Sequence, residues 1–387
     1  MKMKKILISI LIISSLVFPI TSYATSYPAI DKPEIESRSA ILIEQTSGRV
    51  LFEKNADEKR APASVTKIMT ALLVMEQIDS GKLKYTDMIT ASENASDMGG
   101  SQIYLEVGEK MSVDDLLKAL MVASGNDSAV ALGEAVGGSL DNFIKMMNDK
   151  AKQLGMKNTH FVNTNGLPDD NHYSSARDIA IMSRELLLKH NDITKYSTIW
   201  MDSLRGGEFQ LANTNKLLKQ YKGITGLKTG FTTEAMHCLS ASATRDKLNL
   251  ISVILGGPSS DVRFEETKDL LSFGFDNFEF KETIKKGTVI ATTPLKRGKL
   301  REINAVLGED YTLLDNKNRK GEIEREITLL ENITAPVKKG QELGKLTFKK
   351  GDEILDTVTL VAEQDIKKMN YFDYIIRFFE SFSGLIL

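Results

Sequence analysis

Residues 61–70 read APASVTKIMT and begin a predicted helix whose apolar residues continue to about Ile78, with a stop near Gly81. Proline is tolerated at the first positions of a helix. Ser64 and Lys67 stand three residues apart and therefore share a face of its first turn. A serine hydroxyl needs an adjacent base, and a neutral lysine can serve. Because Ser-x-x-Lys also arises by chance, the alternative is a capped helix with an exposed lysine.

A second short motif, Ser124-Gly125-Asn126, stands in a tight glycine break between two predicted helices, Val113–Val122 and Ser128–Val136. In that position the Ser124 hydroxyl and the Asn126 amide can project into a cleft. The same pattern at Ser92-Glu93-Asn94 lies in a polar stretch that is typical of an ordinary helix cap. The position between two predicted helices, rather than the motif itself, therefore favours Ser124 over Ser92 as a site residue.

A third motif, Lys228-Thr229-Gly230, lies on a predicted strand. Side chains alternate along a strand, so Lys228 and Gly230 share one face and Thr229 lies on the other. A glycine here permits close approach of a substrate backbone. The alternative is an edge strand with a solvated lysine.

Strands are predicted at both ends of the region that carries the three motifs, and helices in its middle. Hairpin-like runs occupy Ser39–Glu53, and three more strands are predicted at Gly226–Thr232, Cys238–Thr244 and Leu248–Leu255. The further predicted helices are Leu140–Leu154, Ala176–Leu188 and Phe264–Phe275. This order predicts an α+β fold, in which both ends of the region build a mainly antiparallel sheet and a helical lobe is inserted.

The remaining sequence divides into three further segments. Residues 1–24 have the lysine-rich start, apolar run and small-residue end of a signal peptide, or alternatively of a retained N-terminal anchor. We expect a catalytic domain at residues 25–275. Residues 276–365 have short apolar-polar runs split by Lys-Gly turns, which predicts a small all-β domain.

Residues 366–387 are predicted to form an amphipathic helix in a membrane surface, because large apolar side chains recur at helical spacing while charges fall on the other side. The alternative is a helix packed on its own domain. The apolar positions are Ile366, Met369, Phe372, Ile375, Ile376, Phe379, Phe382 and Ile386.

Composition excludes several kinds of function. The formal net charge is −2 without a Lys/Arg block, so nucleic acid is not an expected partner. Cys238 is the only cysteine, which leaves no internal disulfide and favours a small buried apolar residue. The four histidines share no metal-ligand spacing, so no metal is expected.

Taken together, the three motifs resemble those of penicillin-binding proteins and serine β-lactamases in order and spacing. The text around Ser64 is similar to D-alanyl-D-alanine carboxypeptidases, the low-molecular-mass penicillin-binding proteins of peptidase S11 type. The resemblance extends over about residues 35–362. Further family-like stretches are Phe161–Asn163, Asn165–Leu167, His172–Asp178, Asn213–Asn215 and Gly226–Thr232.

The resemblance implies a β-lactamase/transpeptidase-like sheet with helices on both faces and a helical lobe, followed by the small all-β domain. It also implies removal of the terminal D-alanine from peptidoglycan stems ending in D-Ala-D-Ala, without a cofactor. β-Lactam antibiotics would be inhibitors. For the amphipathic C-terminal helix, the apolar spacing described above predicts attachment to lipid at the outer face of the cytoplasmic membrane. The implied roles are Ser64 as acyl-ester nucleophile, Lys67 as proton acceptor, Ser124 as proton relay, Asn126, Lys228, Thr229 and Gly230 in substrate binding, and the backbone of Ser64 and Phe231 in the oxyanion hole.

Three other functions use the same scaffold. A DD-endopeptidase or transpeptidase would differ in its products. A serine β-lactamase of the commonest class needs a glutamate in a Glu-x-x-Leu-Asn setting, but Glu185 is followed by three leucines. A non-catalytic wall-binding protein is disfavoured by intact Ser64, Lys67 and Lys228. Met236-His237 departs from the small or glycine-containing pair frequent in the family and is expected to alter the rim of the cleft.

Overall fold

The structure is a computed structural model that describes residues 32–318 and 321–383, with side chains only up to residue 379 at the C-terminal end. The predicted signal peptide, residues 1–24, lies outside the described residues. So do the last four residues, which include the predicted apolar position Ile386.

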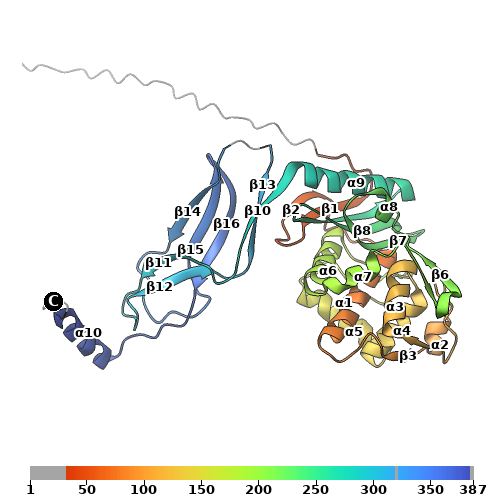
Figure 1. Ribbon diagram of the computed structural model, residues 1–387, viewed down its shortest axis with the longest axis horizontal. Helices are drawn as coiled ribbons and strands as arrows, with labels where there is room; N and C mark the ends of the chain where they lie inside the picture. The colour runs from red at the N-terminus through yellow and green to blue at the C-terminus, as the bar shows by residue number, and fades with distance from the viewer. Residues whose placement is uncertain (1–31, 319–320, 384–387) are drawn as a thin grey trace, which may run out of the picture. The chain divides into compact units, whose positions relative to one another are not determined.

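Strands that are far apart in the sequence form one five-stranded antiparallel sheet in the order β2-β1-β9-β8-β7 (Figure 1). Every residue of β1 is buried, which explains why its four central residues, AILI at 40–43, are all apolar rather than alternating. The edge strand β7 carries the Lys-Thr-Gly motif. The bounds are β1 Ser39–Glu44, β2 Val50–Lys54, β7 Ile224–Thr232, β8 Met236–Arg245 and β9 Leu248–Gly257.

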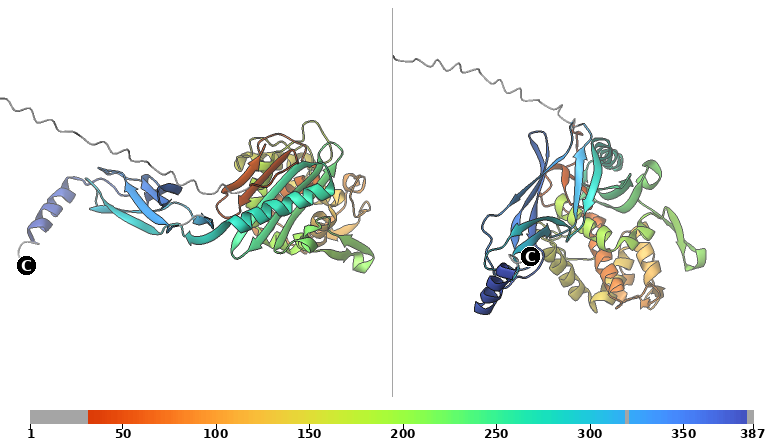
Figure 2. Two further views of the ribbon diagram at one scale, coloured as in Figure 1. Left: turned by 90° about the horizontal axis from the view of Figure 1, so that it is seen from above. Right: turned by 60° about the vertical axis from the view of Figure 1, so that its left-hand side comes forward.

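Helices cover both faces of this sheet (Figure 2). On one face, Ser240 of β8 hydrogen-bonds Ser183 of α6 over 2.8 Å. On the other face, the neighbouring Leu239 and Ala241 pack with Phe264 of α9. The bounds are α1 Lys67–Asp79, α4 Asn126–Gly137, α5 Leu140–Gln153, α6 Ala176–Lys189 and α9 Ser260–Asn277.

Serine caps fix where several of these helices begin. The side chains of Ser139, Ser175 and Ser259 each accept a backbone N–H from the first turn of α5, α6 and α9. Ser92 caps the short helix α2 in the same way, as its polar surroundings predict. The smaller elements are β3 Met88–Thr90, α2 Glu93–Ser96, β4 Lys110–Ser112, α3 Val113–Lys118, α7 Thr194–Ser197, β5 Met201–Leu204, β6 Phe209–Ala212 and α8 Leu217–Gln220.

The β-rich C-terminal part has its own core, in which Leu313, Leu346, Phe348 and Leu360 are buried together. Strands β10 and β13 form one pair, and the order β11-β12-β16-β15-β14 forms a second sheet. The bounds are β10 Phe278–Ile284, β11 Val289–Pro294, β12 Glu302–Leu307, β13 Tyr311–Asn316, β14 Glu324–Leu329, β15 Glu342–Lys350 and β16 Glu353–Ala362.

The C-terminal helix α10, Tyr371–Ser383, starts later than the predicted boundary at residue 366. Ile366 instead forms a bridge with Val337 and belongs to the core of the β-rich part. Met369 is buried as well, and its N–H donates to the Arg297 carbonyl. The helix exposes Tyr371, Phe372, Tyr374, Ile375, Ile376, Phe378 and Phe379.

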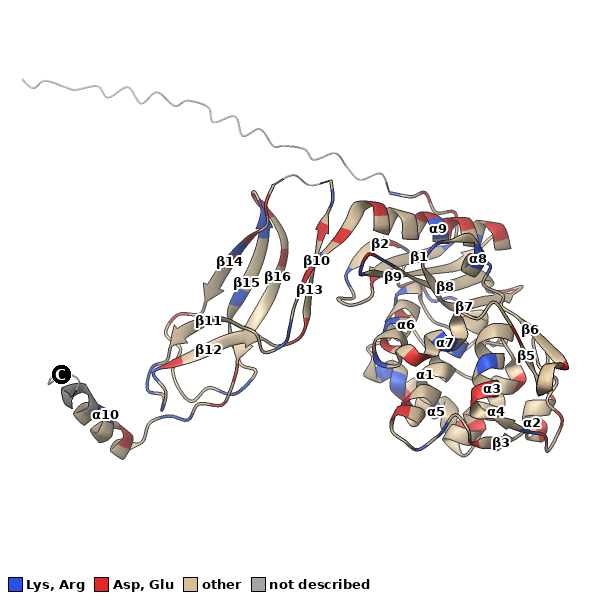
Figure 3. Cartoon of the chain, viewed as in Figure 1, with Lys and Arg blue, Asp and Glu red and all other residues tan. Residues whose placement is uncertain are grey.

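Polar contacts hold α10 on its other side. Arg377 donates to the carbonyl oxygens of Gly298 and Lys299, both over 3.1 Å, and Asp373 pairs with Lys299 at 3.3 Å. Figure 3 shows the described part of α10 mainly in tan, the colour of residues other than Lys, Arg, Asp and Glu. Within the part of the chain that the structure describes, no helix is long and apolar enough to cross a membrane.

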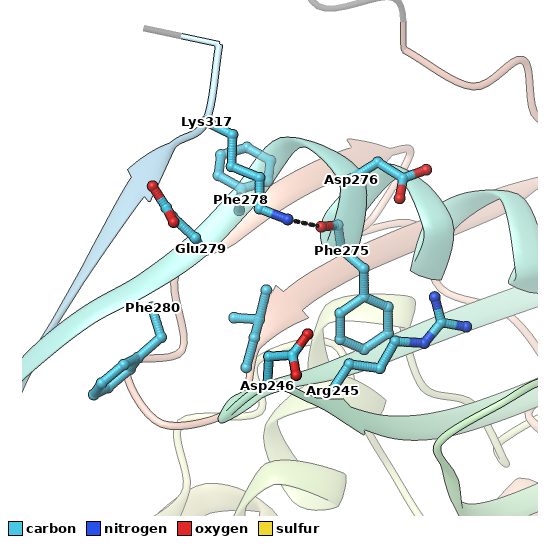
Figure 4. Close-up of a pocket in the computed structure, with 9 residues that line it drawn as sticks. Arg245, Asp246, Phe275, Asp276, Phe278, Glu279, Phe280 and Lys317 are labelled. Atoms are coloured by element: carbon cyan, nitrogen blue, oxygen red, sulfur yellow. Dashed lines mark hydrogen bonds between the residues drawn. The ribbon is translucent and has the colours of Figure 1, made fainter. Parts of the chain in front are cut away.

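A pocket of about 410 Å³ lies where α9 passes into β10 (Figure 4). The Lys317 ammonium donates to the Phe275 carbonyl over 2.6 Å there, and Arg245 lies 4.6 Å from the centre of the Phe275 ring. None of the residues that line this pocket belongs to the three motifs.

Candidate active site

Ser64 lies in a 3₁₀ turn, Ala63–Thr66, that leads directly into α1. Lys67 is the first residue of α1, and its Nζ lies 3.0 Å from Ser64 Oγ. The structure therefore brings these two side chains together. The tight turn differs from the simple α-helical start that the sequence predicts.

The Lys67 amine is fully buried and meets two further oxygens. Asn126 Oδ1 accepts from it at 2.6 Å, and the backbone oxygen of Asn165 accepts at 2.8 Å. Burial holds the pKa of Lys67 well below its usual range, and the nearby Lys228 lowers it further, while Asp127 opposes this shift. Both carbonyl-type oxygens can only accept, so a neutral amine gives them its two hydrogens and keeps its lone pair for the Ser64 hydroxyl.

A hydrogen bond to the backbone orients the side-chain amide of Asn126. Its Nδ2 donates to the Gly99 carbonyl over 2.6 Å, which leaves Oδ1 facing Lys67. Its backbone N–H donates to the Ser101 carbonyl over 2.7 Å. The residue is buried at the first position of α4.

Ser124 closes a π-helical turn, Ala119–Ala123, in the left-handed conformation with φ 62°. It is buried beside Gly125 and Asn126. In the described part of the chain, its hydroxyl makes no hydrogen bond to Ser64 or Lys67. The structure therefore places Asn126 in direct contact with Lys67. Ser124 lies two residues before Asn126 but makes no hydrogen bond to either Ser64 or Lys67.

A loop that the sequence did not single out for chemistry contributes the Asn165 carbonyl. The side chain of Asn163 accepts the backbone N–H groups of Asn165 and Gly166, which shapes a tight turn. Gly166 has φ +88°, and a β-carbon there would lie 1.8 Å from the Ala63 oxygen. The sequence shows a family-like Asn-x-Asn-Gly motif at residues 163–166, but a motif of side chains does not predict a role for a backbone oxygen.

Strand β7 brings the third motif against the nucleophile turn. A β-carbon at Gly230 would lie 3.0 Å from the Ser64 nitrogen, so only a glycine allows this approach without displacement. Lys228 is buried and donates to the Thr229 carbonyl over 3.0 Å. Burial, together with the charge of Arg263, lowers the pKa of Lys228 to about 7. The Thr229 hydroxyl bonds to that of Thr214, from the family-like stretch before β7.

Arg263 of α9 is a second residue that the sequence analysis missed. Its Nη1 donates to the carbonyls of Gly230 and Cys238, each over 3.1 Å, and so ties β7 to β8 beside the site. Burial lowers its pKa to about 10. Nothing in the sequence distinguishes it from an ordinary helix cation.

Cys238 and His237 do not form a reactive pair. Cys238 is buried, and burial raises its pKa to about 11. His237 stacks on Phe231 instead, with ring centroids 4.5 Å apart. Among the described residues, no group of three or more His, Cys, Asp or Glu side chains is arranged to hold a metal ion.

Comparison with known proteins agrees with this geometry. A family model described as D-alanyl-D-alanine carboxypeptidase, peptidase S11, matches residues 26–259, and one described as the penicillin-binding protein 5 C-terminal domain matches residues 278–368. D-alanyl-D-alanine carboxypeptidase DacF of Bacillus subtilis is 44% identical over 346 residues, covering 88% of this chain and 89% of its own. DacA of Escherichia coli is 34% identical over 353 residues, covering 89% of this chain and 87% of its own.

Solved structures agree as well. Penicillin-binding protein 5 of Haemophilus influenzae superimposes with a TM-score of 0.82 at 32% identity, covering 88% of this chain and 100% of that one. This similarity confirms the predicted fold class, a transpeptidase-like sheet-and-helix domain followed by a small all-β domain. The family model alone spans more than half of the sequence, and the chain belongs to the D-alanyl-D-alanine carboxypeptidase family, peptidase S11.

Proposed function

We propose that this protein is a serine-type D-Ala-D-Ala carboxypeptidase that removes the terminal D-alanine from peptidoglycan stem pentapeptides through an acyl-enzyme on Ser64. The observation that carries the proposal is the buried Lys67 amine, which lies 3.0 Å from Ser64 Oγ while two acceptor oxygens occupy its hydrogens. Membership of the family supports the same activity.

In the first step Lys67 takes the hydroxyl proton as Ser64 Oγ attacks the carbonyl carbon of the penultimate D-alanine. Burial and the nearby Lys228 lower the pKa of Lys67, which favours the neutral amine that can accept this proton. The bond from Oγ to the carbonyl carbon forms, and the bond from that carbon to the terminal D-alanine nitrogen breaks. Ser124 relays a proton to the leaving amine, and Asn126 orients the substrate.

The substrate carboxylate is assigned to Lys228 and Thr229, and the backbone N–H groups of Ser64 and Phe231 to the oxyanion hole. The close packing of Gly230 on the Ser64 nitrogen supports this assignment, because it brings the two backbone segments together. Water then hydrolyses the ester and regenerates Ser64. A penicillin would acylate the same hydroxyl.

Transfer of the acyl group to an amine, as in a transpeptidase, uses the same first step, and so does the cleavage of cross-linked stems by an endopeptidase. A β-lactamase would use it on penicillins with fast hydrolysis. Product analysis separates these outcomes. The test of the proposal is the release of D-alanine from a stem pentapeptide by the wild-type chain and by Ser64→Ala. The proposal expects release by the wild type alone, and equal release by both would contradict it.

We further propose that the chain is exported by its N-terminal signal peptide, residues 1–24, and attaches to the outer face of the cell membrane. The row of exposed aromatic and aliphatic side chains on α10 supports attachment, since so large an exposed apolar surface on one helix is typical of an interaction site. The proposed organisation is a catalytic domain at 25–275, a β domain at 276–365 and the membrane helix after it, beginning at Tyr371.

A further inference from the structure

Two stacked rings lie where β7 and β8 leave the site. Phe231 directly follows the Lys-Thr-Gly motif, and its side chain is 58% exposed. His237 is its register partner on β8. The two ring centroids lie 4.5 Å apart with 31° between the planes, so the imidazole supports one face of the benzene ring.

The direction of the substrate along β7 follows from the proposed function, on which this inference rests. The carboxylate end is assigned to Lys228 and Thr229, and the scissile carbonyl to the Phe231 N–H. A peptide bound this way runs antiparallel to β7, which is the free edge of the sheet. The stem residue before the penultimate D-alanine then lies at or beyond Phe231.

The rings offer an apolar and uncharged surface at that place. Burial and the positive charge of Arg263 lower the pKa of His237, whereas Asp261 opposes the shift. His237 covers one face of the Phe231 ring, and the other face is free to contact methylene groups. Because a neutral imidazole does not repel a cation, the free face can also attract an ammonium group.

We propose that Phe231 is a specificity-determining residue that contacts the side chain of the stem residue preceding the penultimate D-alanine, and that His237 positions its ring. The occupant is a diamino acid side chain, an aliphatic chain that ends in an amine. The methylene groups pack on the exposed face of the ring, and the ammonium lies over the same face.

A second exposed aromatic pair provides the matched control. Tyr104, on the loop before β4, is 67% exposed and lies against Phe209 of β6 with centroids 6.2 Å apart. Neither residue lies on β7 or β8. Removal of the Tyr104 ring therefore changes exposed aromatic surface without changing the platform made by Phe231 and His237.

The test compares two synthetic peptides, acyl-Lys-D-Ala-D-Ala and acyl-Ala-D-Ala-D-Ala, by D-alanine release. The wild type is expected to prefer the lysine peptide in kcat/KM by about tenfold, the order of discrimination that a few apolar contacts provide. Phe231→Ala, and Phe231→Leu as a second variant, keep the backbone N–H. The preference should fall to near unity in Phe231→Ala and to an intermediate value in Phe231→Leu. Tyr104→Ala should retain it.

The role of His237 is tested by rescue. His237→Ala should weaken the preference mainly through KM, whereas His237→Phe, which can still stack, should restore it. An unchanged preference in an active Phe231→Ala variant, or no preference in an active wild type, would overturn the inference and leave the proposed function standing. Failure of the wild type to release D-alanine from either peptide would contradict the proposed function, and with it this inference.

Discussion

Gly166 lies directly against Ala63: a β-carbon on residue 166 would stand 1.8 Å from the Ala63 carbonyl oxygen. The backbone of Gly166 also has φ +88°, a conformation that residues with a side chain rarely adopt. This contact joins the loop that carries the Asn165 oxygen to the turn that carries Ser64. The geometry of the Ser64–Lys67 pair therefore depends on a glycine outside the three motifs.

Replacing Gly166 with alanine should displace one of these two segments. We expect a loss of about 3 kcal/mol or more in the free energy of unfolding, because the clash is with backbone rather than with a flexible side chain. D-Alanine release should fall at least tenfold. Chemical denaturation and steady-state kinetics measure the two effects.

Gly155 is the matched control, since it has φ +74° but a β-carbon on it would meet nothing within 4 Å. Gly155→Ala should lower the free energy of unfolding by only about 1 kcal/mol, because alanine disfavours the left-handed conformation. The kinetics of D-alanine release should not change. Equal losses in the two variants would show that backbone conformation, and not the contact with Ala63, decides the effect.

Removing the proposed base should slow acylation strongly. Lys67→Ala is expected to lower both kcat and the rate of penicillin acylation by about 10²–10⁴-fold, the usual contribution of a positioned base. Lys82, exposed past the other end of α1, is the control, and Lys82→Ala should behave as wild type. Stopped-flow acylation with a fluorescent penicillin gives the rates. Near-normal acylation in a folded Lys67→Ala variant would refute the assigned role.

Catalysis should depend on pH through Lys228. Burial and Arg263 lower its pKa to about 7, so the free enzyme loses this positive charge as the pH rises through that value. A carboxylate then binds more weakly, and kcat/KM should fall at higher pH by up to about tenfold per pH unit. Because arginine stays charged, Lys228→Arg should shift the falling limb to higher pH. An unshifted limb would assign the titration to another group.

Membrane attachment should depend on the apolar side of α10. Phe372→Ser with Phe379→Ser should weaken binding to phosphatidylglycerol-containing vesicles at least tenfold, since each buried phenyl ring contributes about 1.5–3 kcal/mol. Asp373→Asn on the polar side is the control. Vesicle co-sedimentation measures binding, and kcat/KM on a soluble peptide should not change. Vesicle binding that survives the double substitution would contradict attachment through this surface.

Much of the fold could be predicted from local patterns. The Ser39–Glu53 hairpin, the strands on either side of Arg245–Lys247 and the closing helix have clear periodicity and turn residues. Helix bounds follow less directly from such patterns: apolar spacing through Ile366 and Met369 predicts a C-terminal helix from residue 366, whereas α10 begins at Tyr371. Ile366 belongs to the core of the β domain and Met369 is buried too, a tertiary reason for apolar side chains that periodicity cannot distinguish from a helix face.

The site was predictable only where the chemistry lies on side chains in short motifs. Ser64, Lys67 and Asn126 come together as those motifs suggest. The Asn165 carbonyl was not predictable, because every residue has a backbone oxygen and only the fold aims this one at Lys67. Arg263 lies 35 residues beyond Lys228, and only the packing of α9 on β8 and β9 brings its guanidinium to the carbonyl oxygens of Gly230 and Cys238.

The central claim is that Ser64 carries the acyl group during the removal of D-alanine. Mass spectrometry of the protein quenched during turnover of a stem pentapeptide tests it most directly. We expect free D-alanine, a shortened tetrapeptide and an acyl adduct on the proteolytic fragment that contains Ser64, and the same fragment should carry penicillin. An adduct on any other residue, or D-alanine release that persists in Ser64→Ala, would contradict it.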